Sequence, residues 1–193
     1  GRIVPATCEI VDIAGLVKGA SKGEGLGNKF LGNIRETDAI IHVLRCFEDE
    51  NITHVDGTID PIRDKEIIDT ELQLKDLETI ESRLAKTEKA AAAGNKEAKI
   101  EVTVLKAYKE VLEQGKNARI VEFESKEEQD AARNLFLLTA KPALYVCNVS
   151  EAEAKAGNAF TQKIEALAKE EGDESMVIAA KTEEDIAELE SYE

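Results

Sequence analysis

Three short stretches of the chain place polar residues directly after apolar, strand-like runs. In the first, Ile10-Val11-Asp12-Ile13-Ala14-Gly15, an aspartate closes an apolar run and a glycine follows three residues later. The carboxyl ends of parallel strands form the ligand-binding edge of an open α/β sheet. At such an edge Asp12 would hold a Mg²⁺ ion through water, and Gly15 would let a backbone N–H approach a terminal phosphate. The pattern therefore indicates nucleoside triphosphate chemistry.

The second stretch, Asn148-Val149-Ser150-Glu151, follows the strand-like run Ala143–Cys147. Guanine-specific nucleotide-binding proteins carry N-K-x-D in the equivalent place, and the aspartate there accepts two hydrogen bonds from guanine. Here Val149 replaces the lysine and Glu151 replaces the aspartate. Because adenine presents one donor and one acceptor on that edge, an acceptor-only carboxylate cannot bind it through two hydrogen bonds. We therefore predict weakened guanine selectivity, with ATP accepted or preferred.

The third stretch is Ala179-Ala180-Lys181, directly after the last strand-like run. It occupies the place of the S-A-K loop, which lies behind the base in the same class of proteins. Ala180 and Lys181 are therefore candidate nucleotide-binding residues. The three stretches occur in the expected order, each at the end of a predicted strand, and together they are far more specific than any one alone.

The elements that would position these residues are short strands separated by helical patterns. The strand-like runs show little alternation of apolar and polar residues, as expected for a parallel sheet covered on both faces. They are Cys8–Ile13, Ala39–Cys46, Ala143–Val149 and Ser175–Ala180. Helices are predicted at Asn28–Glu36 and Asn158–Glu171 and from a capping box at Thr182. The sequence thus predicts an α/β fold.

The middle of the chain predicts two long helices between Pro61 and Gly115, with a turn at Gly94-Asn95. The two helices should pair antiparallel as a hairpin inserted in the α/β domain. Because Glu81 and Glu88 fall in the expected apolar seam, a short two-stranded coiled coil is predicted rather than a deep core. We predict three parts: 1–60 and 117–193 in the α/β domain, and 61–116 in the hairpin.

Charge is unevenly distributed along the 193 residues, whose formal net charge is −15. Residues 1–47 carry six basic and five acidic side chains, whereas the rest of the chain carries 19 basic and 35 acidic ones. A strongly acidic segment opposes direct DNA binding, which needs clustered Lys and Arg. The acidic part is either an ordinary solvated surface or a face for a basic partner.

Cysteine usage and hydropathy indicate a cytoplasmic protein. Cys8, Cys46 and Cys147 are far apart and lie in or beside apolar runs, as expected for buried thiols in a reducing compartment. No apolar run approaches the roughly 18 residues that a membrane span requires, and no signal peptide is present.

The block Val11–Asn28 resembles the signature of the Obg-like ATPases. It contains the run Gly15-Leu16-Val17-Lys18-Gly19-Ala20-Ser21-Lys22-Gly23-Glu24-Gly25. These form the YchF-type branch of the translation-factor-class P-loop GTPases. The similarity continues through Asn33–Ile40, Arg45–Glu48 and Leu138–Pro142, and it covers essentially the whole chain.

The resemblance implies a P-loop NTPase fold with a coiled-coil insertion, Mg²⁺-dependent hydrolysis of ATP or GTP, and a ribosome-related partner. Asp12 and Gly15 would be the switch residues that face Mg²⁺ and the γ-phosphate. Leu16 occupies the place of the glutamine that orients the attacking water in Ras-like proteins. An aliphatic side chain cannot do this, and the family is thought to use a loop histidine, which matches His54. An ordinary surface role for His54 is about as plausible, and His42, within an apolar run, is expected in the core.

One element of the family is missing from the sequence, because no G-x-x-x-x-G-K-[ST] phosphate-binding motif occurs in it. We therefore expect the natural protein to extend in both directions, to a phosphate cradle and to the family's TGS domain. This chain alone should be inactive. The alternative from a different functional class is a non-catalytic interaction module whose acidic helical hairpin docks a protein partner.

Overall fold

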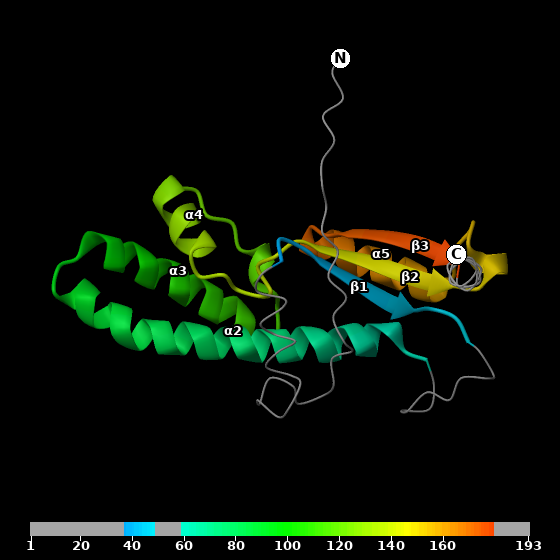
Figure 1. Cartoon of the computed structure of the whole chain (residues 1–193), viewed down its shortest axis with the longest axis horizontal. Coiled ribbons are helices and arrows are strands. Elements are labelled where there is room, and N and C mark those ends of the chain that lie inside the picture. The colour runs from blue at the N-terminus through cyan, green and yellow to red at the C-terminus, as the bar shows by residue number, and fades with distance from the viewer. Residues whose placement is uncertain (1–36, 49–58, 180–193) are drawn as a thin grey trace, which may run out of the picture.

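The computed structural model describes residues 37–48 and 59–179 (Figure 1). Its strands are β1 (Ile40–Arg45), β2 (Ala143–Val149) and β3 (Glu174–Ala179). Its helices are α2 (Pro61–Ala92), α3 (Lys96–Glu113), α4 (Lys126–Arg133) and α5 (Ala159–Glu171), with 3-10 turns η2 (Ala118–Ile120) and η3 (Glu151–Glu153). The predicted strands in this part agree with the structure to within one residue. The strand predicted at Cys8–Ile13 and the helices predicted at Asn28–Glu36 and from Thr182 lie outside the described residues.

The three strands form a parallel sheet in the order β1-β2-β3. One face packs against α5 and the N-terminal half of α2, and its core contains Leu44, Tyr145, Cys147 and Ile164. On the opposite face Ile41, Val43 and Met176 are 55%, 58% and 47% exposed. Among the described residues, helices therefore cover one face of the sheet, whereas the sequence predicted two covered faces.

Local signals in the sequence define the long hairpin of α2 and α3. The Asp60 side chain accepts a hydrogen bond from Arg63 N at 3.1 Å, and Pro61 occupies the first turn, where a missing N–H costs nothing. Gly94 reverses the chain with a φ of +96°, and the Asn95 side chain caps α3 by accepting from Ala98 N. Beyond the sheet the two helices lie side by side (Figure 1). The predicted hairpin is present, and its description as a coiled coil remains a prediction.

The seam of this hairpin differs from the predicted one. Glu81 and Glu88 are exposed, and Ile80 and Leu84 provide the buried contacts of α2. The cluster around them also includes Val104, Leu105, Tyr108, Leu112, Ala118, Leu135 and Leu137. Residues that follow the hairpin thus cover it with a third layer and give it a core of its own. The predicted boundary between residues 116 and 117 divides this cluster.

A buried carboxylate ties the α4–β2 connection to α2. Asp76 is 1% exposed and accepts hydrogen bonds from Leu138 N at 2.8 Å, Thr139 N at 2.8 Å and Thr139 Oγ1 at 2.6 Å. Thr139 Oγ1 in turn accepts a hydrogen bond from Ala118 N. Hydrogen bonds to a charged acceptor are stronger than neutral ones, so this contact fixes where the hairpin leaves the sheet.

A second polar cluster lies at the base of the sheet. Arg119 donates from Nε to Asp173 at 2.7 Å and from Nη2 to Glu171 at 3.1 Å and Tyr145 Oη at 2.8 Å. Its Nη1 donates to Thr139 O at 3.1 Å. The guanidinium therefore joins η2 to the end of α5 and to β2. Because Thr139 also donates to Asp76, these contacts connect the base of the sheet to α2.

Candidate nucleotide-binding site

The stretch Asn148–Glu151, which is predicted to recognise the base, lies at the carboxyl end of β2, as its sequence predicted. Val149 is in register with Ala179, so the chain leaves β2 and β3 at the same level of the sheet edge. Asn148 is half-buried, and its Oδ1 atom is buried without a hydrogen-bond partner. Glu151 is exposed at the start of η3, one turn further along the same edge. An amide oxygen and a carboxylate thus lie three residues apart in the chain at the edge where α/β sheets bind ligands.

Val149 has a different role from the one predicted. Its side chain is 0% exposed and belongs to the sheet core with Leu44 and Ile164. A side chain packed in this core cannot lie over a base as the lysine of N-K-x-D does. The Val149 contribution to the site is therefore to anchor the strand from which Asn148 and Glu151 emerge.

The loop after β2 is held in place by its own hydrogen bonds. Asn158 Nδ2 donates to Cys46 O at 2.7 Å and to Glu153 Oε2 at 3.0 Å, which connects the loop to the end of β1. Asn158 and Thr161 form a capping box at the start of α5. Gly157 has a φ of +70°, and a Cβ there would lie 2.5 Å from Thr161 Oγ1, so only glycine fits without rearrangement. These contacts hold the loop in one conformation.

A cavity of about 310 Å³ opens beside this loop. Its lining residues come from the end of β1, from η3 and its flanks, and from the start of α5: Cys46, Phe47, Glu48, Ser150, Glu153, Asn158, Ala159 and Phe160. The cavity combines two aromatic rings with a few oriented polar groups. This composition is typical of small-ligand sites.

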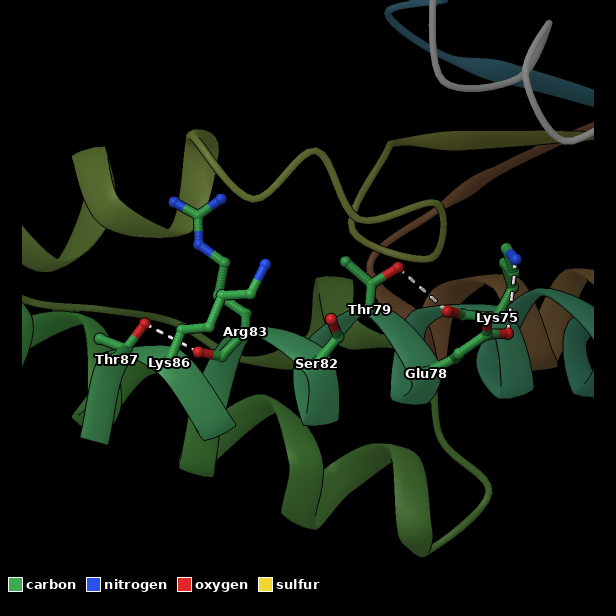
Figure 2. Close-up of a pocket in the computed structure, with 7 residues that line it drawn as sticks. All are labelled: Lys75, Glu78, Thr79, Ser82, Arg83, Lys86 and Thr87. Carbon is green, nitrogen blue, oxygen red and sulfur yellow. Dashed lines mark hydrogen bonds and ion pairs between the residues drawn. The ribbon is translucent and has the colours of Figure 1, made fainter. Parts of the chain in front are cut away.

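A larger hollow of about 490 Å³ lies away from the sheet edge, along one face of α2 (Figure 2). Several of its polar groups already have partners: Lys75 pairs with Glu78 at 3.3 Å, and Arg83 pairs with Glu101 of α3 at 2.5 Å. The Thr87 hydroxyl donates back to Arg83 O. This surface of the helix offers no convergent set of unsatisfied groups for a small ligand.

Arg45 is a residue of the sheet edge that the sequence patterns did not single out. It closes β1, is in register with Asn148, and its guanidinium lies 5.0 Å from the centroid of the Phe47 ring. Its Nε and Nη2 atoms are buried without hydrogen-bond partners. The signal in the sequence was a single charged residue at the end of the otherwise apolar run Ile40–Cys46.

Two thiols of the sheet are buried in its core, and a histidine of β1 is half-buried. Cys46 and Cys147 are free and buried, as predicted. A hydrogen bond to Cys147 and burial raise the pKa of the Cys46 thiol, which keeps it protonated. Burial also lowers the pKa of His42 to about 4, an effect that Lys65 and Arg119 reinforce and Asp69 opposes. His42 is therefore a neutral residue that lies half-buried against Tyr145, whereas the sequence predicted a core position for it.

The remaining predicted site residues, Asp12, Gly15, His54, Ala180 and Lys181, lie outside the described residues. Within the part of the chain that the structure describes, no group of three His, Cys, Asp or Glu side chains is arranged to hold a metal ion. No helix among residues 37–48 and 59–179 is long and apolar enough to cross a membrane.

Comparison with known proteins gives consistent matches. A family model described as "50S ribosome-binding GTPase" matches residues 2–78. The ribosome-binding ATPase YchF of Bacillus subtilis is 52% identical over the whole chain, which covers 53% of that protein. The Obg-like ATPase 1 of Oryza sativa subsp. indica is 45% identical over 90% of the chain, which covers 44% of that protein.

A solved structure agrees with these sequence matches. The YchF GTPase of Schizosaccharomyces pombe superimposes with a TM-score of 0.68 and 38% identity, over 86% of this chain and 46% of that one. The chain thus spans about half the length of the relatives that it matches. Its fold is that of the P-loop GTPases, with a parallel sheet and covering helices. Over its whole length the chain is similar to the Obg-like ATPase family, in its YchF-type branch.

Proposed function

We propose that the chain is the nucleotide-binding part of an ATPase that hydrolyses ATP, or GTP, as a molecular switch and acts on the ribosome in the cytoplasm. The observation that carries the proposal is the unpartnered Asn148 Oδ1, followed three residues later by the exposed Glu151, at the carboxyl edge of a parallel sheet. The names of its relatives, ribosome-binding ATPase and GTPase, support both the reaction and the partner.

Base recognition would rest on Asn148 and Glu151. Asn148 can accept a hydrogen bond through its unpartnered Oδ1, and Glu151 can accept one from the exocyclic amine of adenine. Ala180 and Lys181 would follow directly after β3 and lie behind the base. Since Val149 is packed in the core, no side chain of this stretch takes the place of the guanine-associated lysine. The proposed site therefore accepts adenine.

Hydrolysis would depend on residues outside the described part of the chain. Asp12 would hold Mg²⁺ through water, Gly15 would face the γ-phosphate, and His54 would orient the attacking water in place of Leu16. The bound Mg²⁺ would neutralise charge that develops on the transferred phosphoryl group. The alternative is a non-catalytic interaction module in which the helical hairpin docks a protein partner.

A titration of the full-length protein with ATP and GTP separates these functions. Saturable ATP binding that is at least as tight as GTP binding supports the nucleotide switch, and absence of saturable binding by either nucleotide supports the interaction module. Glu151→Asp is the matched specificity variant. It should shift preference towards GTP, and an unchanged ATP/GTP ratio would remove Glu151 from base recognition. Val149→Lys is unsuitable for this test, because it would place a charge in the core.

A further inference from the structure

Arg45 has unmet hydrogen-bonding capacity at the edge of the sheet. Its Nε and Nη2 atoms are buried and have no hydrogen-bond partner, and no ion pair among the described residues includes it. Arg119 provides the contrast within the same fold, because its three guanidinium nitrogens all donate to protein oxygens. A buried donor without an acceptor is destabilising, so we expect Arg45 to have a hydrogen-bond acceptor in the functional state of the protein.

The free atoms of Arg45 form one particular edge of the guanidinium. Nε–H and Nη2–H point the same way and match two oxygens of a single anionic group, a carboxylate or a phosphate. The face of the guanidinium lies against Phe47, at 5.0 Å from the ring centroid. This cation–π contact fixes the plane of the group and leaves the Nε/Nη2 edge for another partner.

The position of Arg45 makes that partner a ligand of the sheet edge. Arg45 is in register with Asn148, so the two side chains leave the same face of adjacent strands at their carboxyl ends. Asn148 Oδ1 is also buried without a partner. Neighbouring residues thus carry an unsatisfied cation and an unsatisfied acceptor and do not bond to each other. A nucleotide offers what both lack, because its phosphates are anionic and its base carries an amine donor.

We propose that Arg45 is a ligand-binding residue of the nucleotide site, and that its Nε/Nη2 edge binds a phosphate group of the nucleotide whose base Asn148 contacts. The inference rests on the proposed function and adds a phosphate contact contributed by β1. The unmet groups are then a feature of the unliganded site, and nucleotide binding satisfies them.

The test uses Arg45→Gln and Arg45→Lys in the full-length protein, with Arg83→Gln as the control. Arg83 is paired with Glu101 on the hairpin, away from the sheet edge. Affinities for ATP and for adenosine, which lacks phosphates, are measured by calorimetry and by competition. Arg45→Gln should weaken ATP binding by roughly 10- to 100-fold, as expected for loss of a charge-assisted, two-point contact. Adenosine binding should change by less than about twofold, because a neutral ligand does not use this contact.

Two further readouts separate a binding role from a structural one. The midpoint of thermal unfolding without nucleotide should stay the same or rise in Arg45→Gln, because an unpaired buried charge has been removed. Arg45→Lys keeps the positive charge but lacks the paired N–H donors of the Nε/Nη2 edge, so it should lose part of the ATP affinity. Arg83→Gln should bind ATP as the wild type does.

The inference is overturned if Arg45→Gln and Arg45→Lys bind ATP normally, which would assign Arg45 to a carboxylate of the protein. Equal weakening of ATP and adenosine would also overturn it, because Arg45 would then act through Asn148. If the wild type itself binds no nucleotide, the proposed function fails. If the wild type binds ATP and the Arg45 variants bind it equally well, the inference about Arg45 fails but the proposed function stands.

Discussion

The Asp76 carboxylate should be one of the largest single contributors to the stability of the chain. It is 1% exposed and receives three hydrogen bonds, two of them from backbone N–H groups of the α4–β2 connection. Asp76→Ala would leave these donors buried without an acceptor, and a hydrogen bond to a charged group contributes about 1.5–3 kcal/mol. Removal of the buried charge offsets part of that loss. The free energy of unfolding should therefore fall by about 3–5 kcal/mol.

Urea unfolding followed by circular dichroism measures this change. Asp130→Ala on α4 is the matched control, because Asp130 is half-exposed and only pairs with Arg133 at 3.5 Å within the same helix. It should change stability by less than about 0.5 kcal/mol. If Asp76→Ala stayed within about 1 kcal/mol of the wild type, the argument that Asp76 fixes the exit of the hairpin would be wrong.

Two further substitutions test the loop and the core. Gly157→Ala should lower the unfolding free energy by about 1–3 kcal/mol, because it adds a clash with Thr161 to an unfavourable positive φ. Gly94→Ala has a similar φ and no atom within 4 Å of the added Cβ, so thermal unfolding should show a smaller loss, and equal losses would refute the clash. Burial lowers the pKa of His42 to about 4 in the folded chain, below its ordinary value of 6.5. The unfolded chain thus binds the proton first, and stability should fall by up to about 3 kcal/mol from pH 6.5 to pH 4. His42→Gln should flatten the pH dependence of stability, measured by urea titrations between pH 6.5 and pH 4. An unchanged slope would show that other groups cause the pH dependence.

Local signals explain why α2, α3 and α5 were predictable from sequence, whereas α4 was not predicted. Asp60-Pro61 starts α2, Gly94-Asn95 separates α2 from α3, and Gly172 ends α5 with a φ of +75°. Each of these residues acts on the backbone within one turn. Sequence alone is sufficient for such effects.

The register of the hairpin was not predictable in the same way. The heptad pattern that placed Glu81 in the seam extends through the half of α2 that packs on the sheet, where the partners differ. The buried stripe of the outer half is set by Leu135 and Leu137, which follow the hairpin in the sequence. A periodicity argument that considers only the two helices cannot include this third layer.

In the candidate site too, residues were predictable where a local signal exists and were missed where their role depends on distant partners. Asn148 and Glu151 were found because the stretch follows an apolar strand. The burial of Val149 was missed because a motif places residues in order but does not assign them to the two faces of a strand. Arg45 was missed because its significance depends on a neighbour 103 residues away in the sequence, in register across the sheet.

The most direct test of the account is an equilibrium titration of the full-length protein with ATP and GTP, performed on the wild type and on Glu151→Ala. The account predicts saturable ATP binding, at least as tight as GTP binding, that weakens when the Glu151 carboxylate is removed. Absence of saturable binding, or ATP affinity unchanged by Glu151→Ala, would contradict the claim that the carboxyl edge of β2 and β3 recognises the adenine base.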